Sequence, residues 1–426
     1  MKKDDTLKVT PGVLAFLMPD SIMSQNSYEE FRYFYLDYEA KERLYLQKID
    51  KWEKPLKPFT CEDVVVSQDF NTYYYSRKKV DYKKGINVTT ISRTKNITDI
   101  VLNQETSFDK VKKHLVFGKK IAAQMSDTTS AFSYLSDVHD FSKIIGDSSY
   151  EYRTGVEFTP QELYMLVGMG TSRKSSHYRF GNKKFARSKY VVDDMPKNGW
   201  ELPTEHIYPI VTGPSLTPFK CSLENEYCIL PYSADNTDAP IGISEMMTTN
   251  PELFDYLLNH QDLIDSQSEK SKVMHRGEEF YALSKIGPYT FADYIVAARD
   301  NTKFCATVIE PTNTPWGEIK QSICVKHTMI IGRTTSGKFI GKDEAYFIAG
   351  ILNSDIVIQY MQNTFKSNGY SLKKSHFYLP EYDKTNSLHR TISKLAKKAS
   401  GLDDEIKIAK IQRELSKVYI ELCATR

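Results

Sequence analysis

Glu151-Tyr-Arg-Thr-Gly-Val-Glu-Phe-Thr-Pro160 opens the stretch around which this chain is organised, and that stretch continues to Tyr232. Residues 173–190 follow as a basic and aromatic segment with seven Lys or Arg residues and no Asp or Glu. The stretch closes on two short apolar runs, Ile207-Tyr-Pro-Ile-Val-Thr-Gly213 and Tyr227-Cys-Ile-Leu-Pro-Tyr232. Short apolar runs bounded by Gly and Pro are typical of strands. We therefore expect short strands that carry a cationic loop.

The cationic loop is the first candidate for a binding surface. Its cations are Arg173, Lys174, Arg179, Lys183, Lys184, Arg187 and Lys189. Cations neutralise phosphates and flat rings such as Tyr178 stack on bases, so the segment predicts nucleic-acid binding. Arg pairs with guanine edges and Lys with phosphates, which makes five of these side chains candidates for base readout: Arg173, Arg179, Lys183, Lys184 and Arg187. A solvated lysine-rich loop is the alternative, with Tyr178 as a core residue.

Length and composition indicate a folded protein without an overall cationic character. The chain has 426 residues, of which 26% are charged and 40% hydrophobic, and this length suggests roughly two to four domains. The formal net charge is only +3, so any nucleic-acid surface must come from local segregation of charge. The six cysteines form no CxxC pair, which argues against a structural zinc site and favours a reducing compartment. With no signal peptide and no apolar run long enough for a bilayer, we expect a cytoplasmic protein.

Apolar patterns predict the main elements on either side of this stretch. The near-continuous apolarity of residues 9–19 predicts a strand buried on both faces, inside an α/β sheet. Residues 61–68 and 71–76 indicate two more strands. Helical spacing predicts helices over 251–260 and 344–354, and two amphipathic helices over 388–399 and 408–422 separated by Gly401.

A set of short motifs, read in order, carries a resemblance to a known family. The first motifs are Thr10-Pro-Gly-Val-Leu-Ala-Phe-Leu-Met-Pro-Asp-Ser21, Glu29-Glu-Phe-Arg-Tyr-Phe34, Pro58-Phe-Thr-Cys-Glu-Asp-Val-Val-Val66 and Phe70-Asn-Thr-Tyr-Tyr-Tyr75. The later ones are residues 152–160, 208–219, 228–232, 349–354 and 378–380. The ordered set resembles the later part of the TaqI-like amino-group DNA adenine methyltransferases, including the fused type IIG restriction-modification enzymes.

This resemblance implies a three-part organisation. Residues 1–145 would be the distal part of a methyltransferase-like α/β domain with a partial methyltransferase sheet. Residues 146–380 would be an α+β DNA target-recognition domain, and residues 381–426 a helical C-terminal tail for packing or partner docking. Tyr150 and Tyr152 precede the recognition motifs, where a ring could stack near a flipped base; core tyrosines are the alternative.

Two family elements are missing from this chain. The family binds S-adenosylmethionine through an FxGxG-type loop and holds the flipped adenine with an Asn-Pro-Pro-Tyr-type loop. Both should precede Thr10, where only nine residues stand. Asn313-Thr-Pro-Trp316 is the nearest look-alike, but its second residue is Thr and it lies in the recognition region, so we interpret it as a turn. Val167-Gly-Met-Gly170 is too short for a cofactor loop.

The resemblance therefore implies a split enzyme, of which this chain is either a natural subunit or the trimmed C-terminal half. This chain would recognise double-stranded DNA and complete the methyltransferase sheet. A partner chain would hold S-adenosylmethionine and both loops, in a heterodimer that serves a restriction-modification or phage-defence system. On this hypothesis the chain has no catalytic residue of its own, binds no cofactor alone, and is part of an adenine-specific methyltransferase.

Two weaker signals leave other functions open. Gly332-Arg-Thr-Thr-Ser-Gly-Lys338 matches most of a phosphate-binding loop but has Phe339 where Ser or Thr should hold Mg²⁺, so a hairpin turn is the alternative. Arg333 and Lys338 could contact phosphate in either case. Asp300, Glu318 and Lys320 loosely match a Mg²⁺ nuclease triad. A Mg²⁺-dependent nuclease component, and a non-catalytic specificity subunit of a restriction complex, are thus the competing hypotheses.

Overall fold

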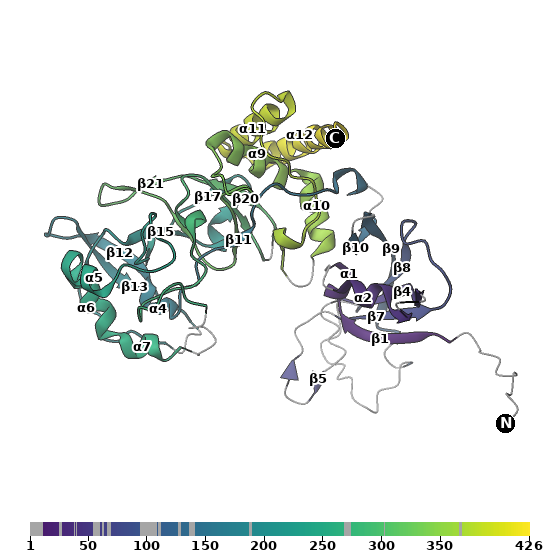
Figure 1. Ribbon diagram of the computed structural model, residues 1–426, viewed down its shortest axis with the longest axis horizontal. Coiled ribbons are helices and arrows are strands. Elements are labelled where there is room, and N and C mark those ends of the chain that lie inside the picture. The colour runs from purple at the N-terminus through teal and green to yellow at the C-terminus, as the bar shows by residue number, and fades with distance from the viewer. Residues whose placement is uncertain are drawn as a thin grey trace, which may run out of the picture. The chain divides into compact units, whose positions relative to one another are not determined.

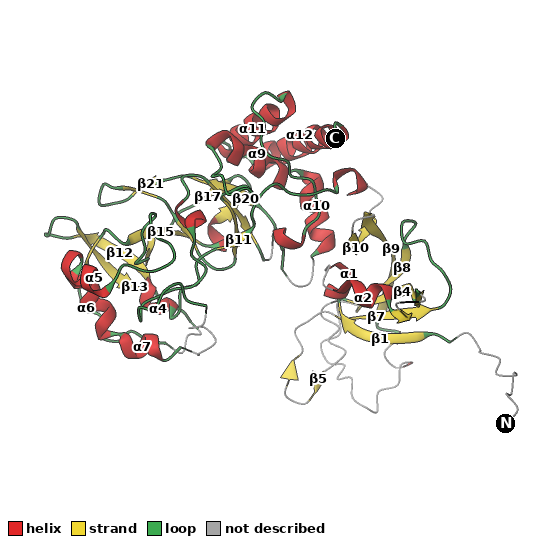
Figure 2. Ribbon diagram, in the orientation of Figure 1, coloured by secondary structure: helices red, strands yellow, loops and turns green. Residues whose placement is uncertain are grey.

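The chain folds into two compact units. The computed structural model describes residues 12–24, 28–37, 39, 41–53, 60–61, 64–65, 70–93, 109, 112–126, 129–135, 141–186, 190–267, 274–301, 303–365 and 369–426. Unit 1 comprises Met1–Ile145 and Gln359–Tyr370, and unit 2 comprises Gly146–Ile358 and Ser371–Arg426. The chain mixes sheets and helices, with an α/β N-terminal part and a helical C-terminal region, as the sequence predicts (Figures 1 and 2).

Unit 1 is built on a six-stranded sheet of order β1-β7-β4-β8-β9-β10. Its strands are β1 Leu14–Pro19, β4 Tyr45–Trp52, β7 Phe70–Ser76, β8 Ile86–Arg93, β9 Leu115–Ser126 and β10 Thr129–Leu135. All neighbours pair antiparallel except β4 and β8, which are parallel. Two short helices, α1 Ser21–Ser24 and α2 Glu29–Tyr33, contact this sheet, and small hairpins are formed by β2 Tyr35–Asp37 with β3 Glu42–Arg43 and by β5 Thr60–Cys61 with β6 Val64–Val65.

Strand β7 explains how unit 1 buries its core. Alternate side chains of a strand point to opposite faces, and in β7 Asn71, Tyr73 and Tyr75 are buried while the residues between them are half-buried. The ring of Phe31 on α2 meets the ring of Tyr75 edge to face, with centroids 5.6 Å apart. The predicted strand over 71–76 is confirmed. Within the predicted strand over 61–68, Cys61 and residues 64–65 are extended in short strands, and residues 62–63 and 66–68 lie outside the described part.

The prediction for the first strand is wrong in one respect. Leu14–Pro19 is a strand, but it stands at the edge of the sheet and is not buried on both faces. Leu14 is 37% exposed and Leu17 is 40% exposed. A continuous apolar sequence shows that a strand could be buried on both of its faces. It does not show whether the fold places another layer of structure on each face.

Unit 2 contains two sheets. The larger has the order β14-β13-β12-β18-β15-β23, with β12 Met165–Thr171, β13 His177–Asn182, β14 Trp200–Pro203, β15 Ile207–Val211, β18 Glu226–Ile229 and β23 Ile323–Cys324. The second has the order β11-β24-β19-β20, with β11 Arg153–Thr154, β19 Ile295–Arg299, β20 Ala306–Ile309 and β24 Thr328–Ile331. Short hairpins are β16 Leu216–Thr217 with β17 Lys220–Cys221, and β21 Thr312–Asn313 with β22 Ile319–Lys320.

Helices cover the larger sheet and help to form its core. They are α4 Gln161–Tyr164, α5 Ile243–Thr249, α6 Pro251–Asn259 and α7 Gln261–Asp265. The predicted helix over 251–260 is confirmed as α6, whose Leu253, Phe254 and Leu257 are buried. These side chains join Leu166 and Phe180 of the sheet in one apolar cluster. Packing against this apolar cluster therefore holds strands β12 and β13 in place on their buried face.

The C-terminal helices belong to unit 2 and pack on one another. They are α9 Lys342–Leu352, α11 Ser387–Ser400 and α12 Glu405–Ala424, with α10 Asp355–Thr364 between α9 and α11 in the chain (Figure 1). Side chains of Asn386 and Asp404 accept hydrogen bonds from the first backbone N–H groups of α11 and α12, which is the usual way a helix start is satisfied. All three predicted helices are thus confirmed. Across the described residues, no helix is both long and apolar enough to span a membrane.

Candidate nucleic-acid interface

The cationic segment is largely a β-hairpin. Strands β12 and β13 pair antiparallel, and residues 172–176 connect them (Figure 2). The turn is held where the backbone N–H of Lys174 donates to the Ser172 hydroxyl at 2.8 Å, and Ser176 takes a left-handed φ of 59°. Strand β13 also pairs with β14, so its position is set from both sides. We call residues 165–184 the basic hairpin.

Strand alternation sorts the side chains of the basic hairpin. Phe180 is fully buried and Tyr178 is 8% exposed, while Arg179 between them is half-exposed on the opposite face. The Tyr178 ring lies 5.4 Å from that of Trp316, measured between centroids. The prediction of a loop over all of residues 173–190 is therefore wrong for 177–182. In this strand cationic side chains alternate with aromatic ones, so its overall composition is like that of an exposed loop. Only the cationic face of the strand meets solvent, while the aromatic face is buried.

Two of the predicted DNA contacts are already paired with carboxylates. The Lys174 ammonium lies 2.9 Å from Glu252 on α6, and Lys183 forms an ion pair with Glu226 on β18. The hydrogen bond from Lys174 lowers the pKa of Glu252. Neither glutamate lies within 173–190, where the sequence has no acid. The sequence separations of these pairs, 78 and 43 residues, leave no local signal that could have predicted them.

The remaining predicted cations divide into three groups. Within the part of the hairpin that the structure describes, Arg173 and Lys184 are exposed and have no ion-pair partner. Arg179 donates from Nε to the Thr171 carbonyl oxygen at 3.0 Å, across the hairpin, and so braces it. Arg187 and Lys189 lie outside the described residues. Arg173 and Lys184 are accordingly the side chains best placed to meet a phosphate.

The three tyrosines predicted to stack on bases pack within the protein in this structure. Tyr150 is 2% exposed; its hydroxyl donates to Glu344 at 2.9 Å and accepts the Tyr382 N–H at 3.1 Å, and burial raises its pKa. Tyr152 is half-buried, and burial raises its pKa to about 12. Tyr178 lies in the cluster with Phe180 described above. Tyr150 and Tyr178 thus take the alternative, core role, because a stacking ring needs an open face.

Two other aromatic residues border a hollow at the end of the basic hairpin. The hollow has a volume of about 540 Å³, and Phe185, Tyr190 and Lys326 contribute to its lining. The Lys183 ammonium lies 5.7 Å from the centroid of the Phe185 ring. Lys326 and Lys285 share the carboxylate of Glu157: burial favours its protonated form, but the two ammonium groups outweigh burial and lower its pKa. This hollow places partly exposed rings next to the basic hairpin, with Glu157 and Glu162 beside Lys326 in its lining.

The second predicted phosphate contact, residues 332–338, is a tight hairpin. The backbone N–H of Thr334 donates to the Lys338 carbonyl at 2.8 Å, and Arg333 donates from Nε to the Gly337 carbonyl at 2.9 Å. The backbone N–H groups of Thr334, Gly337 and Lys338 all donate within the hairpin, whereas a phosphate-binding loop turns such N–H groups toward its ligand. Helix α9 starts only at Lys342. The structure thus has the hairpin form, with Lys338 exposed and 3.5 Å from Glu381.

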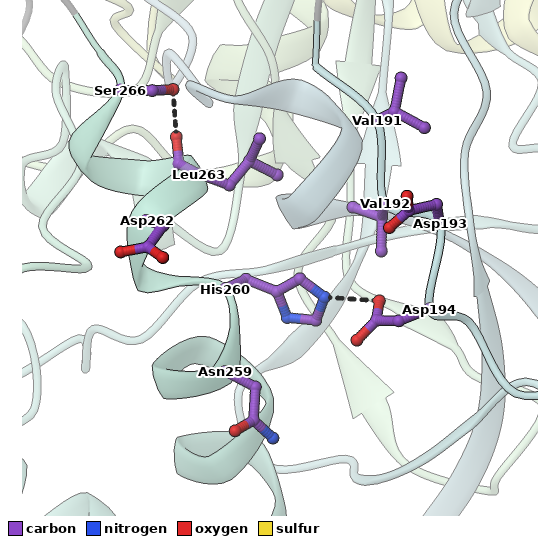
Figure 3. A pocket seen from close by; sticks show the side chains of 9 residues that line it. All are labelled: Val191, Val192, Asp193, Asp194, Asn259, His260, Asp262, Leu263 and Ser266. Carbon is purple, nitrogen blue, oxygen red and sulfur yellow. Dashed lines mark hydrogen bonds and ion pairs between the residues drawn. The ribbon is translucent and has the colours of Figure 1, made fainter.

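A pocket beside the basic hairpin has the opposite charge. It has a volume of about 440 Å³ and lies between residues 191–194 and the α6–α7 region (Figure 3). His260 is fixed at both ring nitrogens, with Nε2 3.0 Å from Asp194 and Nδ1 2.6 Å from the Tyr256 carbonyl oxygen. Asp193 and Asp262 also line the pocket. Three carboxylates repel a phosphate, so this pocket does not extend the cationic surface.

Two residues of the nuclease hypothesis meet, since the Lys320 ammonium lies 3.3 Å from Glu318, but each of the three has a structural role in this fold. Lys320 donates to the carbonyl oxygens of Glu205 at 2.7 Å and Ile207 at 3.1 Å, and burial lowers its pKa. Glu318 accepts a hydrogen bond from the Trp316 indole at 2.8 Å, and Asp300 lies 3.3 Å from His327. The described residues include no group of three or more His, Cys, Asp or Glu side chains that could hold a metal ion.

The two look-alikes of cofactor and catalytic loops are ordinary structural elements. Val167–Gly170 lies inside β12, where it pairs with β13 and β18, so its glycines do not form a loop. Asn313–Trp316 forms the start of the β21–β22 hairpin, in which the Thr314 hydroxyl accepts the Glu318 N–H at 3.1 Å. Trp316 packs on Tyr227 with ring centroids 5.1 Å apart. Neither segment has the form that S-adenosylmethionine or a flipped base requires.

Comparison with known proteins shows which solved structures have a similar fold. No protein-family model matches the chain, and no curated protein matches it by sequence. Among solved structures, the Type IIL restriction-modification enzyme MmeI, solved in complex with DNA, matches 97% of this chain with a TM-score of 0.50 and 11% identity. A nuclease-deletion mutant of the Type ISP restriction-modification enzyme LlaGI, with a DNA substrate mimic, matches 92% with a TM-score of 0.35 and 8% identity. The chain spans 47% of MmeI and 35% of LlaGI, and it shares its fold with part of MmeI.

Proposed function

We propose that this chain is the DNA-recognition part of a site-specific adenine-N6 DNA methyltransferase in a restriction-modification system. S-adenosylmethionine and both catalytic loops would be held by a partner chain. The observation that carries the proposal is the basic hairpin, in which Arg173 and Lys184 are exposed and find no ion-pair partner among the residues that the structure describes. The fold likeness to MmeI, an enzyme solved in complex with DNA, supports it.

The basic hairpin would act by electrostatic contact and by reading base edges. Arg173 lies in the turn, where a guanidinium can reach a phosphate or the guanine edge in a major groove. Lys184, just beyond β13, would neutralise a second phosphate. Because β13 is paired on both sides and packed on the core, the strand that connects these two positions keeps its place before DNA arrives. Phe185 and Tyr190 are the rings best placed to contact a sugar or base.

Duplex DNA binding measured at several salt concentrations tests the proposal. We expect Arg173→Ala with Lys184→Ala to weaken binding and to lower the magnitude of the log–log salt slope by about 2, since each phosphate contact contributes roughly 0.9. Lys174→Ala with Lys183→Ala is the matched control: it removes the same charge from the same hairpin, but from lysines already paired with glutamates, so its effect should be smaller. Equal slopes for wild type and the first variant would contradict this interface.

The methylation part of the proposal needs its own assay. We expect transfer of a labelled methyl group to DNA adenine only when this chain is mixed with a chain that carries FxGxG and Asn-Pro-Pro-Tyr-type loops. Neither look-alike segment in this chain has the required form, as described above. Adenine methylation by residues 1–426 alone would refute the division of labour. DNA binding without methylation in any mixture would favour a non-catalytic specificity subunit.

A further inference from the structure

Unit 2 contains a further hollow that shares no lining residue with the basic hairpin. Residues of β17, β20, α9 and α11 contribute to its lining, and its volume is about 450 Å³. This volume lies within the range of small-molecule sites in proteins. Its lining includes Cys221, Thr307, Val308 and Ser322, all of which belong to unit 2. We call this site the β20 hollow.

Two buried hydroxyl groups in the lining of the β20 hollow lack a hydrogen bond. Thr307 and Ser322 are both almost completely buried, and neither Oγ atom has a hydrogen-bond partner among the residues that the structure describes. Nearly all buried polar groups in proteins are hydrogen-bonded, because burying one without a partner costs free energy. Two such groups in one lining mark the hollow as a place where a hydrogen-bonding ligand gains partners.

The backbone of β20 adds one donor and one acceptor to this lining. In an antiparallel pair, every second residue directs its N–H and C=O away from the neighbouring strand. Ala306 is such a residue in the pair of β20 with β19, since its N–H donates to the Asn353 side chain at 3.0 Å. Val308, two residues further on, therefore has the same orientation. Within the described part of the chain, neither its N–H nor its C=O has a hydrogen-bond partner.

The charges around the β20 hollow favour an uncharged ligand. Lys220 forms an ion pair with Asp403, and Glu310 lies 2.9 Å from the Lys342 ammonium. Burial raises the pKa of the Cys221 thiol to about 12, so this thiol is neutral near pH 7. The lining thus holds one ammonium and one carboxylate, each with its own partner, and neither sign of charge prevails.

We propose that the β20 hollow binds a free nucleoside, an uncharged molecule whose planar base carries a hydrogen-bond donor beside an acceptor. Such an edge is complementary to the N–H and C=O that Val308 directs outward. The hydroxyls of Thr307 and Ser322 both donate and accept, so each pairs with either kind of ligand atom. A free nucleoside fits better than a base within DNA, because the lining has no excess of cations to neutralise the phosphates of a polynucleotide.

Calorimetric titration of the full chain with adenosine, cytidine, guanosine and uridine tests this site. We expect at least one of the four to bind. Thr307→Val combined with Ser322→Ala should weaken that binding at least tenfold, because both hydroxyls are lost with little change of shape. Thr328→Val is the matched control: it removes a buried hydroxyl that donates to the Val325 carbonyl oxygen at 2.6 Å and does not line the hollow, so affinity should stay unchanged.

Thermal unfolding without a nucleoside separates a binding role from a structural one. The double variant at Thr307 and Ser322 should keep or raise the Tm, because it removes buried hydroxyls that have no partner among the described residues. Thr328→Val should lower the Tm, because it breaks a hydrogen bond. Amide hydrogen exchange gives a direct readout, since the bound nucleoside should slow exchange of the Val308 N–H at least tenfold. Duplex DNA binding by the double variant should equal that of wild type.

Four results would overturn the inference. The first is that none of the four nucleosides binds. The second is equal nucleoside affinity for wild type and the double variant. The third is a clear loss of Tm in the double variant, which would show that the two hydroxyls serve the fold. The fourth is protection of the Val308 N–H by a single-stranded oligodeoxynucleotide but by no free nucleoside, which would make the hollow part of a DNA surface.

Discussion

At the scale of single residues, ion pairing decides which cations of the basic hairpin can serve a ligand. Lys174 and Arg173 are adjacent in the chain, yet Lys174 faces Glu252 and Arg173 has no partner among the described residues. Both members of the Lys174–Glu252 pair are exposed, at 52% and 37% of their side-chain surface. Water and salt screen an exposed pair, so such a pair can open when a phosphate competes for the lysine.

Removing the carboxylate should therefore strengthen DNA binding. We expect Glu252→Gln to tighten binding to a duplex by roughly twofold to fivefold at low salt, because Lys174 is freed. The gain should fade as salt is raised, since screening weakens exposed charges. Fluorescence anisotropy at two salt concentrations measures both effects. Glu414 is an exposed carboxylate on α12, and Glu414→Gln is the control for the change in net charge. The same gain in binding by that variant would show that net charge, and not the release of Lys174, explains the effect.

At the scale of elements, close approach between helices decides how the C-terminal region packs. Helix α9 contacts α11 at Gly350, where an added Cβ would lie 2.7 Å from Cγ2 and 3.1 Å from the carbonyl oxygen of Ile392. Just beyond α9, the Asn353 side chain donates to the Ala306 carbonyl at 2.6 Å and accepts the Ala306 N–H at 3.0 Å. These two hydrogen bonds have the pattern of those between paired strands, and they attach the C-terminal end of α9 to β20.

The contact at Gly350 predicts a cost for the smallest possible side chain. Gly350→Ala should gain about 1 kcal/mol of helix propensity but lose roughly 1–3 kcal/mol to overpacking, so we expect a net loss of about 1 kcal/mol. Urea unfolding followed by circular dichroism measures this loss. Gly401→Ala is the control, because its Cβ would meet only the Lys398 carbonyl oxygen at 3.6 Å. Equal stability of the two variants would show that α11 shifts freely to make room.

At the scale of the whole molecule, the chain has two units with separate cores. The core of unit 1 contains Ile49, Tyr73 and Tyr75, and the largest core of unit 2 contains Leu166 and Phe180. Each cluster is drawn from its own unit. Cooperative unfolding generally follows such clusters, because each loses its packing as a whole.

Two unfolding transitions should follow from this division. Ile49→Ala and Leu166→Ala each remove a fully buried side chain and should cost about 2–5 kcal/mol within their own unit. In differential scanning calorimetry we expect each variant to lower the midpoint of a different transition. A single transition shifted by both variants would mean that the units unfold together.

The sequence by itself determined the elements whose signals are local. The helices over 388–399 and 408–422 and the burial of Leu253, Phe254 and Leu257 in α6 follow from spacing alone, because a helix buries one face with a fixed period. Tertiary structure alone decided which charged and aromatic side chains are available to contact a ligand. Glu226 and Glu252 reach the basic hairpin from 43 and 78 residues away, Tyr150 bonds Glu344 across 194 residues, and β1 stands at an edge that composition could not reveal. The reason is physical: periodicity records that a face is apolar or charged, whereas the partner that meets that face is set by how the whole chain folds.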